Sequence, residues 1–393
     1  MAGATEGVRA KWSPRAPVDA STLLIIIGLT VAGIIAVFSA SWPVTSRPLP
    51  DGTPGDAYKF LVSQTTYAIL GGICCMAFSY LPPARYRRAA KLGFGLSILL
   101  MLAVFTPLGV EMGGARRWLQ IGPLMFQPSE LAKVALIVYL ARCVTTPKAW
   151  PDKQTHTYFA CMCATALVCG ICLLQRDMGS AVVIFCLGLV VLFYAGLKWW
   201  TVAFTWSVAT MIGLYFAWIE PYRWRRITAF LHPTEDTDDT AYHLIRMLIT
   251  CARGGLVGPG PGLSREKWLA LPARHTDAIF CVIASELGFI GGAALVIVFL
   301  MLMYRVLQLA RRQPDRFSTI LLASLGTGIV LQALVNMGVA TGVLPCTGIT
   351  LPFISAGGSS LLVTLMASGM ILSLSRQAAP ERKEEAAECL PAA

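Results

Sequence analysis

Ionisable side chains in an otherwise apolar chain are the first candidates for chemistry, because a charge buried in a membrane is costly and needs a partner. Asp277 stands in LPARHTDAIF (271–280), at the start of a long apolar run, with His275 two residues before it. A single carboxylate placed there could act as a general base. The alternative is a helix N-cap, for which Thr276 and Asp277 are both suitable. Glu286 lies about 13.5 Å further along a helix, too far to form a close carboxylate pair with Asp277.

A second group of charges lies in GARRWLQIGPLMFQPSELAK, residues 114–133. Glu130 and Lys133 are three residues apart, so on a helix that begins near Pro128 they share one face and can pair. Arg116 and Arg117 precede them and suit the oxygens of a phosphate or pyrophosphate. The group therefore indicates either an anion site or an interfacial anchor with a structural ion pair.

The long connection 219–276 carries further basic residues. Arg223 and Arg226 alternate with aromatic residues in PYRWRRITAFLHP (221–233), a pattern typical of an amphipathic helix at a membrane interface. A second amphipathic stretch covers 241–252, and the glycine-rich RGGLVGPGPG follows it. These glycines indicate either a flexible loop or a close approach of the backbone to a ligand, and the stretch lacks the lysine of a nucleotide-binding loop.

Prolines and glycines interrupt the last apolar region, VLPCTGITLPFISAGGSSLL (343–362). Broken backbone at membrane depth is tolerated where it lines a cavity or is buried in protein. Ser355 and Ser359 are its candidate contacts to a substrate. Asn336, in the preceding apolar run, is interpreted as an interhelical hydrogen-bonding residue.

The composition of the chain indicates that these residues are positioned by a membrane protein. Of the 393 residues, 56% are hydrophobic and 13% are charged, against about a quarter charged in soluble domains. We therefore predict an all-α polytopic fold of about ten transmembrane helices. The expected spans are roughly 21–41, 59–81, 92–108, 129–146, 157–175, 179–197, 200–218, 277–304, 317–341 and 354–375.

Basic residues set the orientation of these spans, because cytoplasmic connections are enriched in Lys and Arg. One set of tails and connections holds 18 of the 32 basic residues, and the opposite set, without the long loop, holds five. Both termini are therefore expected in the cytoplasm, as tails over 1–20 and 376–393 that flank a membrane domain over 21–375. The loop 219–276 and all the candidate site residues then fall on the outer side. The net charge of +11 mainly sets topology and gives no reason to expect a nucleic acid partner.

The 12 cysteines give little sign of a metal site. Cys161 and Cys163 have no partner at zinc spacing, so core packing is the preferred interpretation and no metal ligands are assigned. Cys251, Cys281 and Cys346 fall on or near the outer side, and the sequence leaves open whether any two of them pair.

Taken together, these segments resemble the SEDS family of membrane glycosyltransferases over about residues 21–375, and its division branch more than its elongation branch. The motifs that carry the resemblance are GARRW, FQPSELAK, PYRWRR, the GG-x-x-G-x-G loop, LP-x-x-HTD, ELGFIGG and TGITLPFIS-x-GGSS. The resemblance implies polymerisation of lipid II into glycan strands at the outer face of the bacterial cytoplasmic membrane. It also implies a class B penicillin-binding protein and other division proteins as partners.

The family's essential aspartate matches Asp277, which the resemblance makes the general base. Its arginine and Glu/Lys positions match Arg116, Arg117, Glu130 and Lys133, which would bind the substrate. A divalent cation, Mg²⁺ or Mn²⁺, could share the charge of the leaving pyrophosphate.

The chain departs from the family pattern at several positions, which raises the question of reduced activity or dependence on a partner. A lipid II flippase and a non-catalytic scaffold of the division machinery are the alternative functions. The departures are Arg176, His243, Arg246, Arg253, Ala278 and Ala356.

Overall fold

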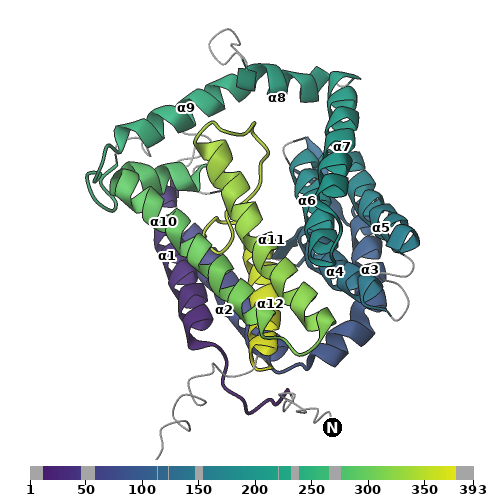
Figure 1. Ribbon diagram of the computed structural model, residues 1–393. Helices are drawn as coiled ribbons and strands as arrows, with labels where there is room; N and C mark the ends of the chain where they lie inside the picture. The colour runs from purple at the N-terminus through teal and green to yellow at the C-terminus, as the bar shows by residue number, and fades with distance from the viewer. Residues whose placement is uncertain are drawn as a thin grey trace, which may run out of the picture.

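The protein is described by a computed structural model, in which ten long helices match the ten expected spans in order (Figure 1). The all-α polytopic fold is confirmed. The helices are α1 (Ala20–Thr45), α2 (Lys59–Ser79), α3 (Pro83–Ala103), α4 (Pro128–Val144), α5 (Gln154–Leu174), α6 (Met178–Tyr194), α7 (Trp199–Ile219), α10 (Ile279–Arg311), α11 (Arg316–Ala340) and α12 (Gly358–Ser375). The structure describes residues 12–45, 58–112, 114–122, 124–146, 154–219, 221–231, 239–264 and 276–377.

Seven helices in the described part of the chain are long and apolar enough to cross a membrane: α1, α2, α5, α7, α10, α11 and α12. Helix α6 is apolar but shorter, and α3 and α4 carry charged residues. The bounds of α3 correct the sequence-based expectation of 92–108. Pro83 occupies the first turn, where its missing N–H costs nothing, so the helix begins within the basic stretch that precedes the apolar run.

Helices α11 and α12 form the centre of the bundle and are largely buried. Helix α12 packs most extensively on α2, and α11 packs on α10, α6 and α4. Helix α7 stands at the periphery, and its large apolar side chains are mostly exposed. Such a surface on a spanning helix is what lipid tails would cover.

The two ends of the described chain meet at one end of the bundle. The indole Nε1 of Trp12 donates to the carbonyl oxygen of Ser373 at 3.1 Å, and the Arg376 guanidinium donates to the carbonyl of Pro14 at 2.9 Å. Asp19 forms an ion pair with Arg305 at the end of α10, with 2.6 Å between Oδ1 and Nη2. Helices α1, α10 and α12 are therefore joined at this end.

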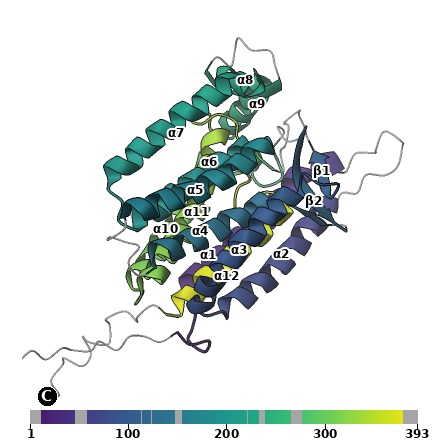
Figure 2. The same ribbon diagram turned by 90° about the vertical axis from the view of Figure 1, so that its right-hand side faces the viewer.

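A small three-stranded antiparallel sheet connects α3 to α4 and was not expected from the sequence. Its strands are β1 (Gly109–Met112), β2 (Ala115–Ile121) and β3 (Leu124–Phe126), in the order β1-β2-β3. It lies towards the end of the bundle that α8 (Pro221–Leu231) and α9 (Asp239–Arg253) also cover, as Figure 2 shows. The two amphipathic helices expected in the long loop are confirmed, and they run across the bundle from α7 to α10.

Helix α10 is broken at Gly288, whose backbone has φ 69° and ψ −170°. The break frees amides that bind the glycine-rich loop after α9: Phe289 N donates to Gly255 O at 2.8 Å, and Ile290 N to Leu256 O at 3.1 Å. A Cβ on Gly258 would stand 2.3 Å from the carbonyl oxygen of Glu286. The glycines thus allow two backbones to approach each other closely. The sequence alone left open whether they make the loop flexible or let the backbone approach a ligand.

Candidate active site

Asp277 lies in a turn over 276–278, directly before α10, and is half-buried. The N-cap of α10 is Ala278, so Asp277 stands one residue before the capping position. Two side chains hold this turn by its backbone. Asn336 Nδ2 donates to the Asp277 carbonyl at 3.1 Å, and Ser355 Oγ donates to the Thr276 carbonyl at 2.7 Å.

The non-helical segment between α11 and α12 passes beside the Asp277 carboxylate. A Cβ added to Gly348 would stand 3.7 Å from Asp277 Oδ2, and Gly348 has φ +70°, which disfavours other residues. Asn336 Nδ2 also donates to Ile349 O at 2.7 Å, and Gln332 Nε2 donates to Thr350 O at 3.1 Å. Two side-chain amides, one helical turn apart on α11, therefore fix the segment that borders the carboxylate.

The serines expected to contact a substrate lie inside the protein. Ser355 is 3% exposed, and its hydroxyl also accepts a hydrogen bond from Leu351 N at 2.8 Å. Ser359 is 1% exposed in the first turn of α12, and its Oγ has no hydrogen-bond partner in the described part of the chain. Ser355 therefore positions the backbone next to Asp277.

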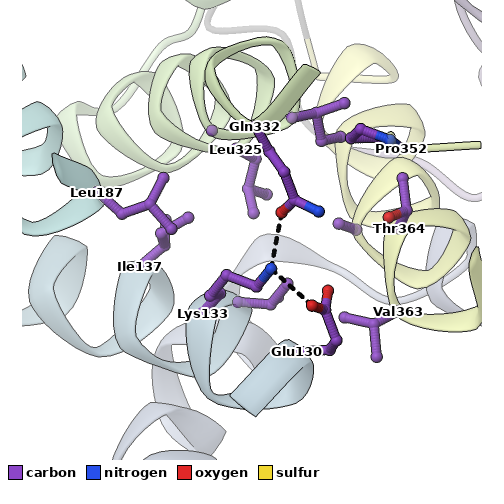
Figure 3. A pocket seen from close by; sticks show the side chains of 13 residues that line it. Glu130, Lys133, Ile137, Leu187, Leu325, Gln332, Pro352, Val363 and Thr364 are labelled. Carbon is purple, nitrogen blue, oxygen red and sulfur yellow. Dashed lines mark hydrogen bonds and ion pairs between the residues drawn. The ribbon is translucent and has the colours of Figure 1, made fainter. Parts of the chain in front are cut away.

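Glu130 and Lys133 form the expected ion pair, deep in the bundle, as Figure 3 shows. Lys133 Nζ lies 2.9 Å from Glu130 Oε1 and 2.7 Å from Gln332 Oε1. The two side chains face a cavity of about 40 Å³ between α4, α6, α11 and α12, to which Thr364 and Pro352 also contribute. That volume suits a few water molecules and not a sugar. The geometry therefore matches a structural ion pair better than an open anion site.

Arg116 and Arg117 lie on β2, where successive side chains point to opposite faces of the sheet. Arg116 is exposed and stands opposite Glu111 of β1. Arg117 lies 3.8 Å from Asp177, measured from Nη1 to Oδ1. Asp177 caps α6 through Ser180 N and also accepts from Gln127 Nε2 at 3.0 Å. Of the two arginines, Arg116 is the more accessible cation.

The remaining site residues are placed only in part. His275 lies outside the described residues, and so do the side chains of Arg223 and Arg226, whose backbone belongs to α8. Two departures from the family pattern are resolved in detail. Arg246 stacks over the Tyr242 ring at 5.0 Å on α9, and Ala278, next to Asp277, is fully buried.

Three residues escaped prediction as site residues: Gln332 and, in its contact with Asp277, Asn336, which bind backbone carbonyls, and Gly348, which borders the Asp277 carboxylate. Polar side chains in the apolar run of α11 were the available signal for the two amides. Their partners are carbonyl groups of distant segments, which no local pattern identifies.

The model of the FtsW/RodA/SpoVE family, described as "Cell cycle protein", matches residues 20–379. The chain belongs to this family. A relative from Geobacter metallireducens, named probable peptidoglycan glycosyltransferase FtsW, is 39% identical over 363 residues, covering 91% of this chain and 94% of the relative. A relative of the same name from Coxiella burnetii is 34% identical over 360 residues, with 91% and 95% covered.

Solved structures agree with this family membership. A chain of a peptidoglycan synthase complex, studied for its coordination of polymerisation and crosslinking, matches with a TM-score of 0.76 and 30% identity, covering 91% of this chain and 98% of that one. RodA from Thermus thermophilus matches with a TM-score of 0.66 and 28% identity, with 93% and 98% covered. The chain is a multi-pass bacterial membrane protein, and the predicted enzyme class, a peptidoglycan glycosyltransferase, is confirmed.

Proposed function

We propose that this member of the FtsW/RodA/SpoVE family polymerises lipid II at the outer face of the cytoplasmic membrane during cell division, with Asp277 as the general base. One observation carries the proposal. A half-buried carboxylate stands in a turn that Asn336 and Ser355 hold by its backbone, beside Gly348, which has no side chain. A base held in this way costs little to organise when the reaction begins.

The reaction joins a sugar hydroxyl of one lipid II to the anomeric carbon of another. Asp277 takes the hydroxyl proton as the new C–O bond forms, and the bond from the anomeric carbon to the pyrophosphate oxygen breaks. The leaving group carries its negative charge away, so it needs a cation and no protonated acid. Arg116 on β2 is the most accessible candidate, and Arg117 could join it by exchanging Asp177 for a phosphate oxygen.

A divalent cation could share this charge. No group of three or more His, Cys, Asp and Glu side chains in the described ranges has a metal-binding arrangement. Mg²⁺ is commonly held by one or two carboxylates together with substrate phosphates and water. Because Asp277 is assigned to the attacking hydroxyl, such a cation would take its ligands mainly from the substrate pyrophosphate and from water.

The proposed partners are a class B penicillin-binding protein and other division proteins, and the proposed topology places both termini in the cytoplasm. The contacts of Trp12 with Ser373 and of Arg376 with Pro14 support it, since they bring both ends of the described chain to one end of the bundle. Asp277 belongs with α8 and α9 at the opposite end, which would face outward.

The test is polymerisation of labelled lipid II by the purified chain with its transpeptidase partner. Asp277→Asn keeps the size of the side chain and removes the base, so we expect the rate to fall by about 10²-fold or more. Asp315→Asn is the matched control, because Asp315 caps α11 through Ser318 N in a helix start away from this site. Glycan produced at the wild-type rate by Asp277→Asn would contradict the mechanism. Lipid II translocation without polymerisation would instead favour a flippase. Restoration of cell division by Asp277→Asn in cells that lack the protein would favour a scaffold.

A further inference from the structure

Two cysteines from different elements meet beside the turn that carries Asp277. Cys251 lies on α9 and Cys281 lies in the first turn of α10. Each sulfur is 3.7 Å from the same acceptor, the carbonyl oxygen of Ala340 at the end of α11. The two thiols also lie close enough to influence each other's ionisation.

The two thiols differ in access. Cys281 is fully buried, whereas Cys251 is half-buried on a helix at the surface of the bundle. The neighbouring Cys281 thiol lowers the pKa of the Cys251 thiol despite its burial, which increases the fraction of reactive thiolate. An external oxidant would therefore meet Cys251 first, with Cys281 placed to react second.

We propose that Cys251 and Cys281 are a dithiol site that forms a reversible disulfide and thereby joins α9 covalently to α10. The proposal rests on the topology of the proposed function, which places this end of the bundle in the oxidising compartment outside the membrane. Both cysteines are without a disulfide bond in the structure.

The oxidant is a disulfide, either of a thiol oxidase or of a small molecule. The Cys251 thiolate attacks one sulfur of that disulfide, forms a mixed disulfide and releases one thiol. The Cys281 thiolate then attacks the Cys251 sulfur and releases the second thiol. Two electrons and two protons pass from the cysteines to the oxidant, whose S–S bond is replaced by two S–H bonds.

The bond would close a ring over residues 251–281, which contains both the glycine-rich loop and Asp277. Helix α9 is otherwise held on α10 and α11 by packing, in part through the buried Leu244 and Met247. A covalent link would therefore limit any movement of α9 away from the Asp277 turn. Closing a ring of this length also stabilises the folded chain, mainly by restricting the unfolded one.

The experiment treats the purified full-length chain in detergent with oxidised glutathione, blocks the remaining thiols and digests with trypsin. The peptide MLITCAR (247–253) contains Cys251 as its single cysteine. In the wild type we expect this peptide to disappear, to join a peptide containing Cys281, and to return after reduction. The midpoint of thermal unfolding should rise on oxidation.

Two variants test the pairing. In Cys281→Ser the second thiol is missing, so MLITCAR should accumulate as a glutathione adduct and the thermal shift should be lost. Cys346→Ser should keep the disulfide. A Cys251 thiol that stays open to alkylation in the oxidised wild type, or that links to Cys346, would overturn the proposal. These measurements need no lipid II. A negative result would therefore overturn the disulfide without contradicting the proposed polymerase reaction, and a chain without polymerase activity could still form the disulfide.

Discussion

Lys133 and Glu130 depend on each other because both are buried where water is scarce. The Lys133 ammonium has two oxygen partners, Glu130 Oε1 and Gln332 Oε1, and Gln332 in turn binds the Thr350 carbonyl. Removing one member of such a pair leaves an uncompensated charge, whereas replacing both members can be nearly neutral. The ion pair therefore joins α4, through α11, to the segment that borders Asp277.

We predict that Lys133→Met destabilises the chain by about 3–5 kcal/mol and that Glu130→Gln added to it restores most of the loss. Thermal unfolding of both variants in detergent measures this, and Glu130→Gln alone is the control. If the pair is structural, the double variant also regains lipid II polymerisation. A double variant that is stable but inactive would instead place Lys133 in contact with substrate.

Residue types alone identified Asp277 and the Glu130–Lys133 pair, since an acid or base in an apolar run is conspicuous. Sequence could not show that Ser355 binds the Thr276 carbonyl, 79 positions away, or that Gly348 borders the carboxylate. Those contacts depend on how α11 and α12 pack. For the same reason, the interpretation of Ser355 as a substrate contact gives way to one in which it positions the turn.

At the scale of elements, the break in α10 and the glycine-rich loop form one unit. The loop supplies carbonyl acceptors for the amides that the break frees, and Gly260 N donates to Glu286 O at 2.9 Å in return. Glu286 itself accepts from Ser39 of α1, with 2.6 Å between Oγ and Oε1. The loop, α10 and α1 are thus connected through a few residues below the Asp277 turn.

We predict that Gly288→Ala abolishes polymerisation and lowers the unfolding midpoint sharply. Its Cβ would stand 2.4 Å from the Leu256 carbonyl oxygen, and its φ and ψ belong to a region populated almost only by glycine. Gly255→Ala is the matched control: φ is +58° and no atom of the described residues lies within 4 Å of the new Cβ, so the cost is about 1–2 kcal/mol. Equal effects of the two substitutions would contradict the role given to backbone contact.

The sheet was predictable in principle. Two residues, Gly-Gly (113–114), separate β1 from β2, and Gly-Pro (122–123) separates β2 from β3. Glycine-containing two-residue connections between short runs are a hairpin signal. The signal is weak because the runs are short and carry two consecutive arginines, and the surrounding apolar spans dominate any search by hydropathy.

At the scale of the whole molecule, Asp19 joins the beginning of α1 to the end of α10. It accepts hydrogen bonds from Thr22 N at 2.9 Å and Thr22 Oγ1 at 2.7 Å, in addition to the ion pair with Arg305. Burial by itself raises the pKa of Asp19, but the hydrogen bonds from Arg305 and Thr22 outweigh it, so the pKa lies below its ordinary value.

A lowered pKa in the folded state means that the unfolded chain binds more protons as the pH falls. The contribution of Asp19 to stability is therefore full above its ordinary pKa of about 4 and is lost as the pH falls through the lowered pKa. We predict that Asp19→Asn lowers the unfolding midpoint at neutral pH. The difference in midpoint between the variant and the wild type should become smaller below about pH 4. Unfolding midpoints measured across that range test this. A gap that stays constant with pH would contradict it.

The sequence by itself determined the class of protein, the ten spans, the amphipathic helices of the long loop and the identity of the candidate base. Hydrophobic length, helical period and a charge in an apolar run are local properties, and they suffice for these features. Tertiary structure decided what surrounds the base: the amides of α11, the break in α10 and the paired thiols. Each of these joins groups far apart in the chain through backbone carbonyls, which are the same in every residue and leave no trace in the sequence.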